Sequence, residues 1–356
     1  MKIFLACALL TIGFSANALE LEFISRFDIP TKQVFKKSRI GGLSGLYFES
    51  GSQALFAISD DRGNVDEPRI YEFKIQMPPK EFKVEPQNVI FLTVNTTQSS
   101  HHSSASSAQI FSKVLDLEAI SMTPWGDFLL ANEGDNNQKP RVRPQLLLAK
   151  RDGTLLREFP VPDAYLPELT GIQKKGVQNN LAFEGLAAHP NGKEWILATE
   201  APLVQDPKTF VRFQQYEMAE AWVLKPTKEY HYPYSEGRVD LPEVIEIQKG
   251  ISEVQYLNDH KLLVLERLLQ VMKSGIKFQA QIYETDLKSA GADGLLTKKL
   301  ILELGNLEAK IGKLDNFEGM TWGPLLSDGR RSLILVSDDN FMRKQRTEFL
   351  LFAVKE

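Results

Sequence analysis

Short apolar runs, separated by turn residues, recur along the whole chain in a fixed order. Each unit opens with a similar four-residue motif, beginning at Leu43, Leu117, Phe183, Ile251 and Phe317. A second apolar run follows each motif and ends in an acid, namely Asp60, Glu133, Glu200, Glu266 and Asp338. Runs that are rich in Leu, Ile, Val and Phe and bounded by Gly, Pro, Asn and Asp are typical of β-strands. No segment keeps a 3.6-residue apolar period long enough to indicate a long helix.

The spacing of the motifs predicts the architecture. They lie about 70 residues apart, and most units hold four apolar runs, so we predict an all-β fold, a β-propeller of five four-stranded blades. The last unit ends after its third run, and the segment 21–29 is expected to close the ring as its fourth strand. In the third unit, 221–225 and 244–247 are expected as the third and fourth strands. A six-bladed ring, with a degenerate blade within 201–243, is the alternative.

The first residues have the pattern of an export signal. Lys2 precedes an apolar stretch over 3–16, and Ala16-Asn17-Ala18 forms a small-x-small cleavage site. The stretch is shorter than the roughly 18 residues that span a bilayer, so no membrane insertion is expected. We predict a signal peptide over 1–18, a single domain over 19–356, and a periplasmic or secreted location. Cys7 is the only cysteine, so the mature chain would contain no disulfide.

Composition narrows the possible partners. The chain is 43% hydrophobic and 25% charged, which is typical of a globular protein. Its formal net charge is −4 and it has no basic tract, so nucleic acid is not an expected partner. We also expect the protein to be a monomer.

The repeat predicts an acidic central opening. In a four-stranded blade the first strand lines the channel and its neighbour runs antiparallel, so the start of strand one and the end of strand two share a face. The motif positions that start strand one hold Ser44, Glu118, Glu184, Ser252 and Glu318. The acids that end strand two would lie beside them, with Asp135 and Asp339 just beyond. Carboxylates from several blades should therefore converge around one axis.

So many carboxylates require compensation. Two unit charges ~4 Å apart repel by about 4 kcal/mol at an effective dielectric constant near 20. Raised pKa values, bound cations or Arg and Lys partners can relieve this repulsion. All-oxygen ligands suit Ca²⁺, whereas zinc is disfavoured because the repeats hold no cysteine and no His pair. The candidate metal ligands are Asp60, Glu133, Asp135, Glu200, Glu266, Asp338 and Asp339. Alternatively, such acids cap turns or pair with arginines of the next blade.

Basic residues are expected around the same opening. The connections between strands two and three carry many Arg and Lys residues, which would form a rim suited to phosphate. We take Arg62, Arg143, Arg267 and Arg346 as candidate substrate-binding residues, and Glu118, Glu184 and Glu318 as candidate catalytic residues. A solvated loop surface is the alternative for the rim.

These motifs together resemble a known family. The segments GLSGL, LEAI, FEGLA and FEGM, with SDDRG, NEGDNN, ATEAPL and VSDDNF, are similar to the phytase-like domain named "esterase-like activity of phytase". The resemblance extends from about Phe35 to Phe352. It implies an exported bacterial protein whose recurrent acids carry a phosphoesterase-type activity. The matching positions are Glu118, Glu133, Asp135, Asn136, Glu184, Glu200, Glu318, Asp338, Asp339 and Asn340, and the departures are Ser44 and Ser252.

Two classes of function remain open from the sequence. The favoured one is a Ca²⁺-dependent phosphoric ester hydrolase that acts on a small anionic, phosphorylated substrate. In this class, a metal-bound water attacks phosphorus and arginines stabilise the charge. The alternative is a non-enzymatic, Ca²⁺-stabilised propeller that binds an anionic or protein ligand. A Ser-His-Asp esterase is disfavoured, because the sequence has no G-x-S-x-G elbow and none of its histidines occupies a repeated acid position.

Overall fold

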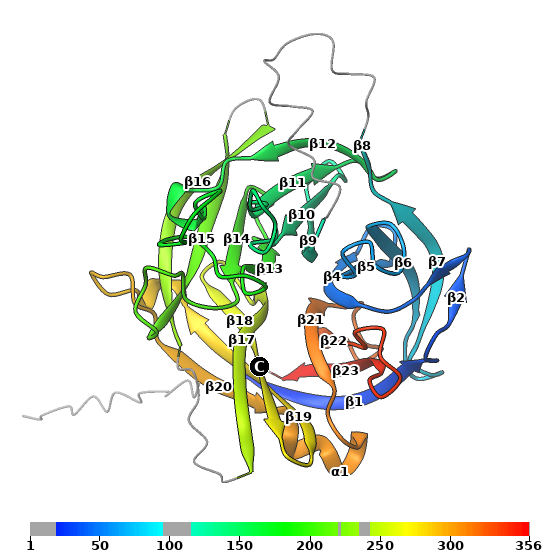
Figure 1. The fold of residues 1–356 in the computed structure, drawn as a ribbon. Helices are drawn as coiled ribbons and strands as arrows, with labels where there is room; N and C mark the ends of the chain where they lie inside the picture. Colours follow the sequence, from blue (N-terminus) through cyan, green and yellow to red (C-terminus); the bar gives the residue numbers. More distant parts are fainter. Residues whose placement is uncertain (1–18, 95–114, 220–221, 235–242, 356) are drawn as a thin grey trace, which may run out of the picture.

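The computed structural model describes residues 19–94, 115–219, 222–234 and 243–355. Antiparallel sheets radiate from a central axis, each with its first strand innermost (Figure 1). From the axis outward, blade one is β4 (Leu43–Glu49), β5 (Ala54–Ser59), β6 (Arg69–Gln76) and β7 (Lys83–Phe91). Blade two is β9 (Leu117–Met122), β10 (Phe128–Asn132), β11 (Gln145–Ala149) and β12 (Thr154–Phe159), extended by the short β8 (Thr93–Val94).

The remaining blades follow the same order. Blade three is β13 (Phe183–Ala188), β14 (Glu194–Thr199), β15 (Phe210–Ala219) and β16 (Val223–Pro233). Blade four is β17 (Val244–Tyr256), β18 (Lys261–Met272), β19 (Gly275–Asp286) and β20 (Lys298–Glu303). Blade five is β21 (Asn316–Trp322), β22 (Ser332–Asp338), β23 (Thr347–Lys355) and β1 (Glu20–Ile29). The protein is a five-bladed β-propeller, as predicted.

Short elements connect the blades. They are the strand pair β2 (Val34–Phe35) and β3 (Ser38–Arg39), the helix α1 (Glu308–Ile311), and the 3-10 helices η2 (Asp163–Tyr165), η4 (Leu287–Ser289) and η5 (Leu304–Leu307). Among the described residues, no helix is long and apolar enough to cross a membrane. The predicted signal peptide, residues 1–18, and the Ser-rich stretch with His101-His102 lie outside the described residues.

The ring closes as the sequence predicts. β1 pairs antiparallel with β23, from Glu20 opposite Lys355 to Ile29 opposite Thr347. The two ends of the domain thus belong to one blade, so the last sheet has no unpaired third strand. This pairing joins the first and last strands of the chain and holds the ring together.

Two strand predictions in the third unit are wrong. The third and fourth strands of blade three are β15 and β16, rather than 221–225 and 244–247. β15 alternates buried Val211 and Phe213 with polar residues, so it shows no continuous apolar run. Residues 244–247 instead begin β17, the long inner strand of blade four. The six-bladed alternative is likewise wrong, because the described part of 201–243 supplies these outer strands of blade three.

Apolar side chains are buried between neighbouring blades. Five clusters of buried residues are present, and each joins two adjacent sheets. Between blades one and five, for example, Leu55 and Phe73 pack in the same cluster as Val336 and Phe349. The interleaved faces form the core, while the axis is left for the polar ends of the inner strands. Burial between the blades therefore fixes where the inner strands converge.

Every inner strand has a β-bulge at its motif residue. The pairing register with strand two shifts at Ser44-Gly45 in β4, and at Glu118, Glu184, Ser252 and Glu318 in the other inner strands. A bulge leaves one extra residue out of the ladder and re-aims its side chain. The repeated motif therefore encodes a repeated bulge that presents a Glu or Ser at the axis.

The inner strands approach one another closely beside the bulges. A Cβ built on Gly319 would lie 2.2 Å from the backbone oxygen of Ser44 in blade one. A Cβ on Gly45 would lie 2.7 Å from the backbone oxygen of Glu118 in blade two. Gly45 and Gly319, which follow the motif residue in blades one and five, are therefore required by backbone packing around the axis.

We expect Gly319→Ala to destabilise the fold by about 1–3 kcal/mol or more, because the added methyl group overlaps backbone that cannot move aside. Gly51→Ala is the matched control, since a Cβ there meets no atom within 4 Å. Its effect should stay within about 0.5 kcal/mol. Urea unfolding of the two variants measures the difference, and equal stabilities would contradict the close packing at the axis.

Candidate functional site

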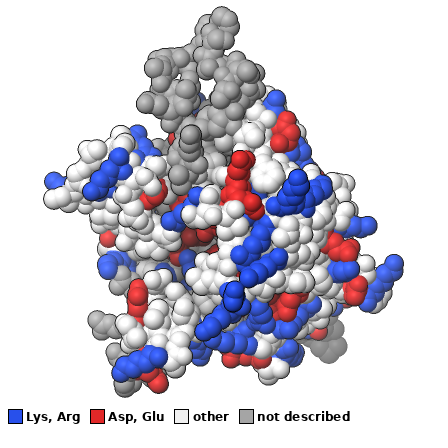
Figure 2. All heavy atoms as spheres, turned by 45° about the vertical axis from the view of Figure 1, so that its right-hand side comes forward, with Lys and Arg blue, Asp and Glu red and all other residues white. Residues whose placement is uncertain are grey.

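The bulged ends of the inner strands surround an acidic opening, which we call the throat. Its carboxylates come from the starts of the inner strands and from the ends of the second strands; they are Asp60, Asp116, Glu118, Glu133, Glu184, Glu200, Glu318 and Asp338. All except the partly exposed Asp60 are buried. In Figure 2, acidic side chains lie inside a hollow, and Lys and Arg side chains cover surface beside it.

Three of these acids form a group between blades one and two. Asp60, Asp116 and Glu118 each place a carboxylate oxygen within 4.8 Å of the others. The Arg62 guanidinium lies 2.6 Å from the Asp116 carboxylate and also donates to the side chain of Asn180. We call Asp60, Asp116 and Glu118 the open triad, because Asp60 and Arg62 retain solvent exposure.

A second group lies between blades two and three. Glu133, Glu184 and Glu200 likewise place carboxylate oxygens within 4.8 Å of one another. All three side chains are buried, and we call them the closed triad. The Glu133 carboxylate accepts a hydrogen bond from the Ala182 backbone N–H, which connects the two blades. Both triads thus span blade boundaries.

Arg267 is the cation that reaches the largest number of throat acids. Its guanidinium lies 2.7 Å from Glu200, 3.6 Å from Glu318 and 3.9 Å from Glu184. Burial disfavours its charged form, but the surrounding carboxylates outweigh burial and raise the pKa of Arg267. The guanidinium therefore stays charged and offsets part of the acidic charge of blades three and five.

Strand two of blade four reaches the throat with an arginine. In the pairing register, Arg267, and not Glu266, occupies the position that an acid such as Asp338 holds in the other blades. Gly250 pairs with Arg267 just as Asn316 pairs with Asp338, and Ile251 pairs with Glu266 as Phe317 does with Ser337. The sequence alignment of Glu266 with Asp338 is therefore shifted by one residue. Glu266 instead contacts Lys249 at 2.8 Å, the ammonium group of Lys298, and the Tyr232 hydroxyl at 2.6 Å.

Two further predicted metal ligands, Asp135 and Asp339, are not among the throat acids and bond within turns. Asp135 accepts hydrogen bonds from Asn137 and Gln138 in its own connection. The buried Asp339 accepts from the backbone N–H groups of Gly42 and Phe341, which fixes the turn after β22.

Two of the four arginines expected at the rim, Arg143 and Arg346, show no contact with the triad acids in the described part of the chain. Arg346 contacts Asp315, which directly precedes β21, at 3.6 Å and Glu348, on β23, at 3.3 Å. Arg143 is exposed, and its charge lowers the pKa of Glu158, although burial leaves that pKa raised overall. Arg62 and Arg267 are thus the predicted arginines that the structure brings into contact with the throat acids.

The sequence analysis missed two throat residues, Asp116 and Asn316. Both stand two positions before the motif residue, at a site that holds Gly42, Ala182 and Gly250 in the other blades. The Asn316 amide donates to the Glu318 carboxylate at 2.7 Å. No repeated residue type marks this position in the sequence. The structure shows why it lies at the throat, because strand two bonds back to it in blades one to three, as in Glu133 N–H to Asp116 C=O at 2.8 Å.

Burial and the short distances between the throat acids raise their pKa values. Burial raises the pKa of Glu118 well above its ordinary value, and the charges of Asp60 and Glu184 raise it further. Burial and Glu200 raise the pKa of Glu184 well above the usual range, with Arg267 opposing them. Burial, followed by Asp116, has the same effect on the pKa of Glu133. Without a bound cation, these acids would therefore keep their protons to a higher pH than exposed carboxylic acids do.

Both triads fit a hard metal ion. Each supplies only carboxylate oxygens, the ligand type that Ca²⁺ and Mg²⁺ prefer. The buried oxygens Asp116 Oδ1, Glu133 Oε2 and Glu184 Oε2 have no hydrogen-bond partner among the described residues. Buried acceptors without a partner are uncommon in folded proteins and point to a missing ligand. The two acidic clusters could therefore hold metal ions.

A polar cleft adjoins the throat. It has a volume of about 480 Å³ and is lined by Asn180 and Ala201, which lie next to Arg62 and Glu200, and by Lys208, Gln248 and Lys249. The cleft extends from Asn180 and Ala201 to the first part of β17, where residues 246–249 line it. A molecule bound at Arg62 would have room there for a polar substituent.

In EDTA, the melting temperature should fall as pH rises from about 5 to 8. The native throat acids have raised pKa values, so above their ordinary values the native state binds more protons than the unfolded state. Stability is then present at low pH and is lost as these acids ionise. Excess Ca²⁺ should reduce the fall, because the cation replaces the protons.

Calorimetry at several pH values measures this slope. Glu118→Gln should flatten it in EDTA, whereas Glu217→Gln, an exposed acid on β15, should leave it unchanged. A melting temperature in EDTA that rises over this pH range would contradict the raised pKa values.

Solved structures of similar fold have little sequence in common with the chain. An endo-arabinase from Bacteroides thetaiotaomicron is 12% identical with a TM-score of 0.47, and the match covers 93% of this chain and 97% of that one. A periplasmic gluconolactonase from Pseudomonas aeruginosa is 10% identical with a TM-score of 0.36, covering 89% and 86%. An endo-arabinanase from Bacillus licheniformis is 10% identical with a TM-score of 0.40, covering 88% and 94%.

The comparison with curated proteins finds no significant match. The family model described as "Phytase-like: Esterase-like activity of phytase" matches residues 38–341, which include the inner strands of all the blades and every throat acid described above. The chain therefore belongs to the phytase-like family.

Proposed function

We propose that the protein is a Ca²⁺-dependent phosphoric ester hydrolase that acts at the open triad. The observation that carries this proposal is the pairing of a carboxylate group that fits a cation with Arg62 at its exposed side. A divalent cation bound there would polarise a phosphoryl oxygen and lower the pKa of a bound water. The signal-peptide pattern supports a periplasmic or secreted enzyme, and the family name agrees with ester hydrolysis.

The residues of the open triad have distinct roles in this proposal. Arg62 binds the phosphate group and neutralises its charge, held in place by Asp116 and Asn180. Asp60 and Asp116 hold the cation. A Glu118 carboxylate oxygen accepts the proton of the attacking water and returns it to the leaving alkoxide, a role suited to its raised pKa. The adjoining cleft accepts the rest of the substrate.

The closed triad has a structural role in the same proposal. Its side chains are buried on all sides, with Glu184 and Glu200 only 3% exposed, so a cation there has no path to a substrate. Such a cation would hold blades two and three together, since Glu133 and the pair Glu184 and Glu200 come from these two sheets. Ca²⁺ would then contribute to both stability and catalysis, at separate triads.

The burial of the throat also favours the second candidate, a Ca²⁺-stabilised binding propeller without catalysis. In the open triad Asp116 and Glu118 are only 1% and 5% exposed, which leaves Asp60 and Arg62 as the accessible groups. A protein of this kind would hold an anionic ligand at Arg62 and the polar cleft without turning it over.

Phosphate release from phytate, phosphomonoesters and phosphodiesters, with Ca²⁺ or EDTA, tests the proposal. Glu118→Gln should lower turnover by roughly 10²-fold, the scale of one general acid–base contribution. Glu184→Gln should chiefly lower the stabilisation by Ca²⁺, and Glu217→Gln should change neither. These three variants all replace a Glu by its neutral isostere, so they differ only in position.

The outcomes separate the two candidates. Calcium-dependent turnover that is lost in Glu118→Gln alone supports the hydrolase. If the parent hydrolyses no ester but binds inorganic phosphate, and Arg62→Met weakens this binding, the binding propeller is supported and the hydrolase is refuted. Full activity in Glu118→Gln would place the chemistry outside the open triad.

A further inference from the structure

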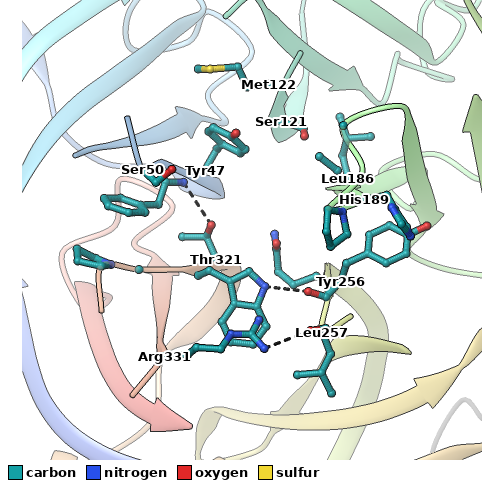
Figure 3. A pocket seen from close by; sticks show the side chains of 18 of the residues that line it. Tyr47, Ser50, Ser121, Met122, Leu186, His189, Tyr256, Leu257, Thr321 and Arg331 are labelled. Atoms are coloured by element: carbon teal, nitrogen blue, oxygen red, sulfur yellow. Dashed lines mark hydrogen bonds between the residues drawn. The ribbon is translucent and has the colours of Figure 1, made fainter. Parts of the chain in front are cut away.

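A second cavity lies at the opposite end of the axis from the throat. It has a volume of about 700 Å³ and is formed where the inner strands end, with Tyr47, Ser121, Leu186, Gln255, Thr321 and Trp322 among its lining residues. Figure 3 shows Tyr47, Ser121, Leu186 and Thr321 around its opening. A cavity of this size suits a small-molecule ligand. None of the throat acids lines it.

On β17, Glu253 stands between Ser252, the motif residue at the throat, and Gln255, which lines the cavity. It occupies the position at which the other inner strands have Gly or Ala, and its side chain is fully buried. Its carboxyl group accepts hydrogen bonds from the backbone N–H groups of Leu186, at 3.1 Å, and Val254, at 2.9 Å, and it also bonds to the backbone of Leu46. These contacts join blades one, three and four between the level of the throat and that of the cavity.

Hydrogen bonds between blades hold the cavity walls in place. The Trp322 indole N–H donates to Tyr256 C=O at 2.9 Å, and the Gln255 amide donates to Met320 C=O at 2.9 Å. Thr321 Oγ1 accepts from the Phe48 N–H at 3.3 Å. The Arg331 guanidinium stacks 3.8 Å from the Trp322 ring centroid. Walls held in this way form the cavity before any ligand arrives.

The lining has the chemistry of a site for an uncharged polar ring. Aromatic surface comes from Tyr47 and Trp322, and hydroxyl and amide groups come from Ser121, Thr321 and Gln255. No described lining residue is Asp, Glu or Lys. The charged Arg331 lines the cavity, and its guanidinium donates to Leu257 C=O at 3.2 Å and stacks on Trp322. The Ser121 side chain is fully buried and lines the cavity, yet its Oγ has no hydrogen-bond partner among the described residues. A hydroxyl group of a ligand in the cavity would supply such a partner.

We propose that this cavity binds a neutral carbohydrate of one or two sugar rings. A sugar ring presents C–H groups on its faces, which pack on aromatic side chains, and hydroxyl groups at its edge, which need donors and acceptors. Trp322 and Tyr47 supply the first kind of contact, and Ser121 with its polar neighbours supplies the second. The described lining has no acid or lysine, and its one arginine, Arg331, is engaged by Leu257 C=O and the Trp322 ring, which matches an uncharged ligand. This proposal is independent of the reaction at the throat.

Tryptophan fluorescence of the full-length mature protein, titrated with glucose, galactose, maltose, cellobiose and sucrose, tests the proposal. At least one sugar should change the emission, with a Kd between about 10 μM and 1 mM, as expected for ligands of this size. Ser121→Ala should weaken binding about fivefold without loss of stability, because it removes a hydroxyl that has no protein partner. Trp322→Phe should abolish the emission change.

Two controls locate the signal. Trp125→Phe removes an exposed indole that does not line the cavity, so the emission change should persist. Glu118→Gln should bind the sugar as the parent does, whatever its effect on ester hydrolysis. Calorimetric titration of Ser121→Ala checks the affinity independently of fluorescence. If no sugar binds, if only the amphiphilic anion decanoate binds, or if Ser121→Ala and Trp322→Phe respond as the parent does, the proposal is wrong.

Discussion

Burying several carboxylates around one axis costs electrostatic free energy, and the rest of the throat depends on how this cost is offset. The bulge in each inner strand aims the motif side chain at the axis, so the repeat itself creates the repulsion. Blade four relieves part of it, since it has Ser252 in place of Glu and Arg267 in place of the terminal acid. Arg267 then bonds to acids of blades three and five.

One arginine cannot neutralise the whole set. Asp60, Glu118 and Asp338 lie toward blades one, two and five, and neighbouring carboxylates raise the pKa of each, after burial, well above its ordinary value. Protons at low pH or cations at neutral pH would supply the remaining positive charge. The stability of the protein would then depend on both pH and bound metal through the same throat carboxylates. The apolar clusters between the blades stabilise the fold, and this stabilisation offsets the free-energy cost of burying charged groups at the axis.

Much of this organisation could be predicted from the sequence. Five motifs with matched second runs gave the blade number, the closing strand β1 and the placement of Glu118, Glu184 and Glu318 at one opening. Repetition makes such features visible, since each blade repeats the signal. The features that were missed are those in which one blade departs from the others.

Arg267 illustrates the limit of the repeat. Glu266 and Arg267 are adjacent and both charged, and only the pairing of Ile251 with Glu266 shows which of them ends the strand at the throat. Asp116 precedes its motif, at a position held by Gly or Ala in most other blades, so no repeat identifies it. The outer strands of blade three alternate polar and buried residues, and their apolar signal is therefore weak. Local spacing cannot resolve such cases, because tertiary contacts across blades decide them.

The most direct test of the account is to locate Ca²⁺ in crystals of the protein by its anomalous scattering at long wavelength. The account predicts one peak within the open triad, between Asp60, Asp116 and Glu118, and another within the closed triad of Glu133, Glu184 and Glu200. Both should disappear from crystals treated with EDTA. Density for water alone in both triads at saturating Ca²⁺ would contradict the account, because the throat would then be balanced by protons and arginines without a metal.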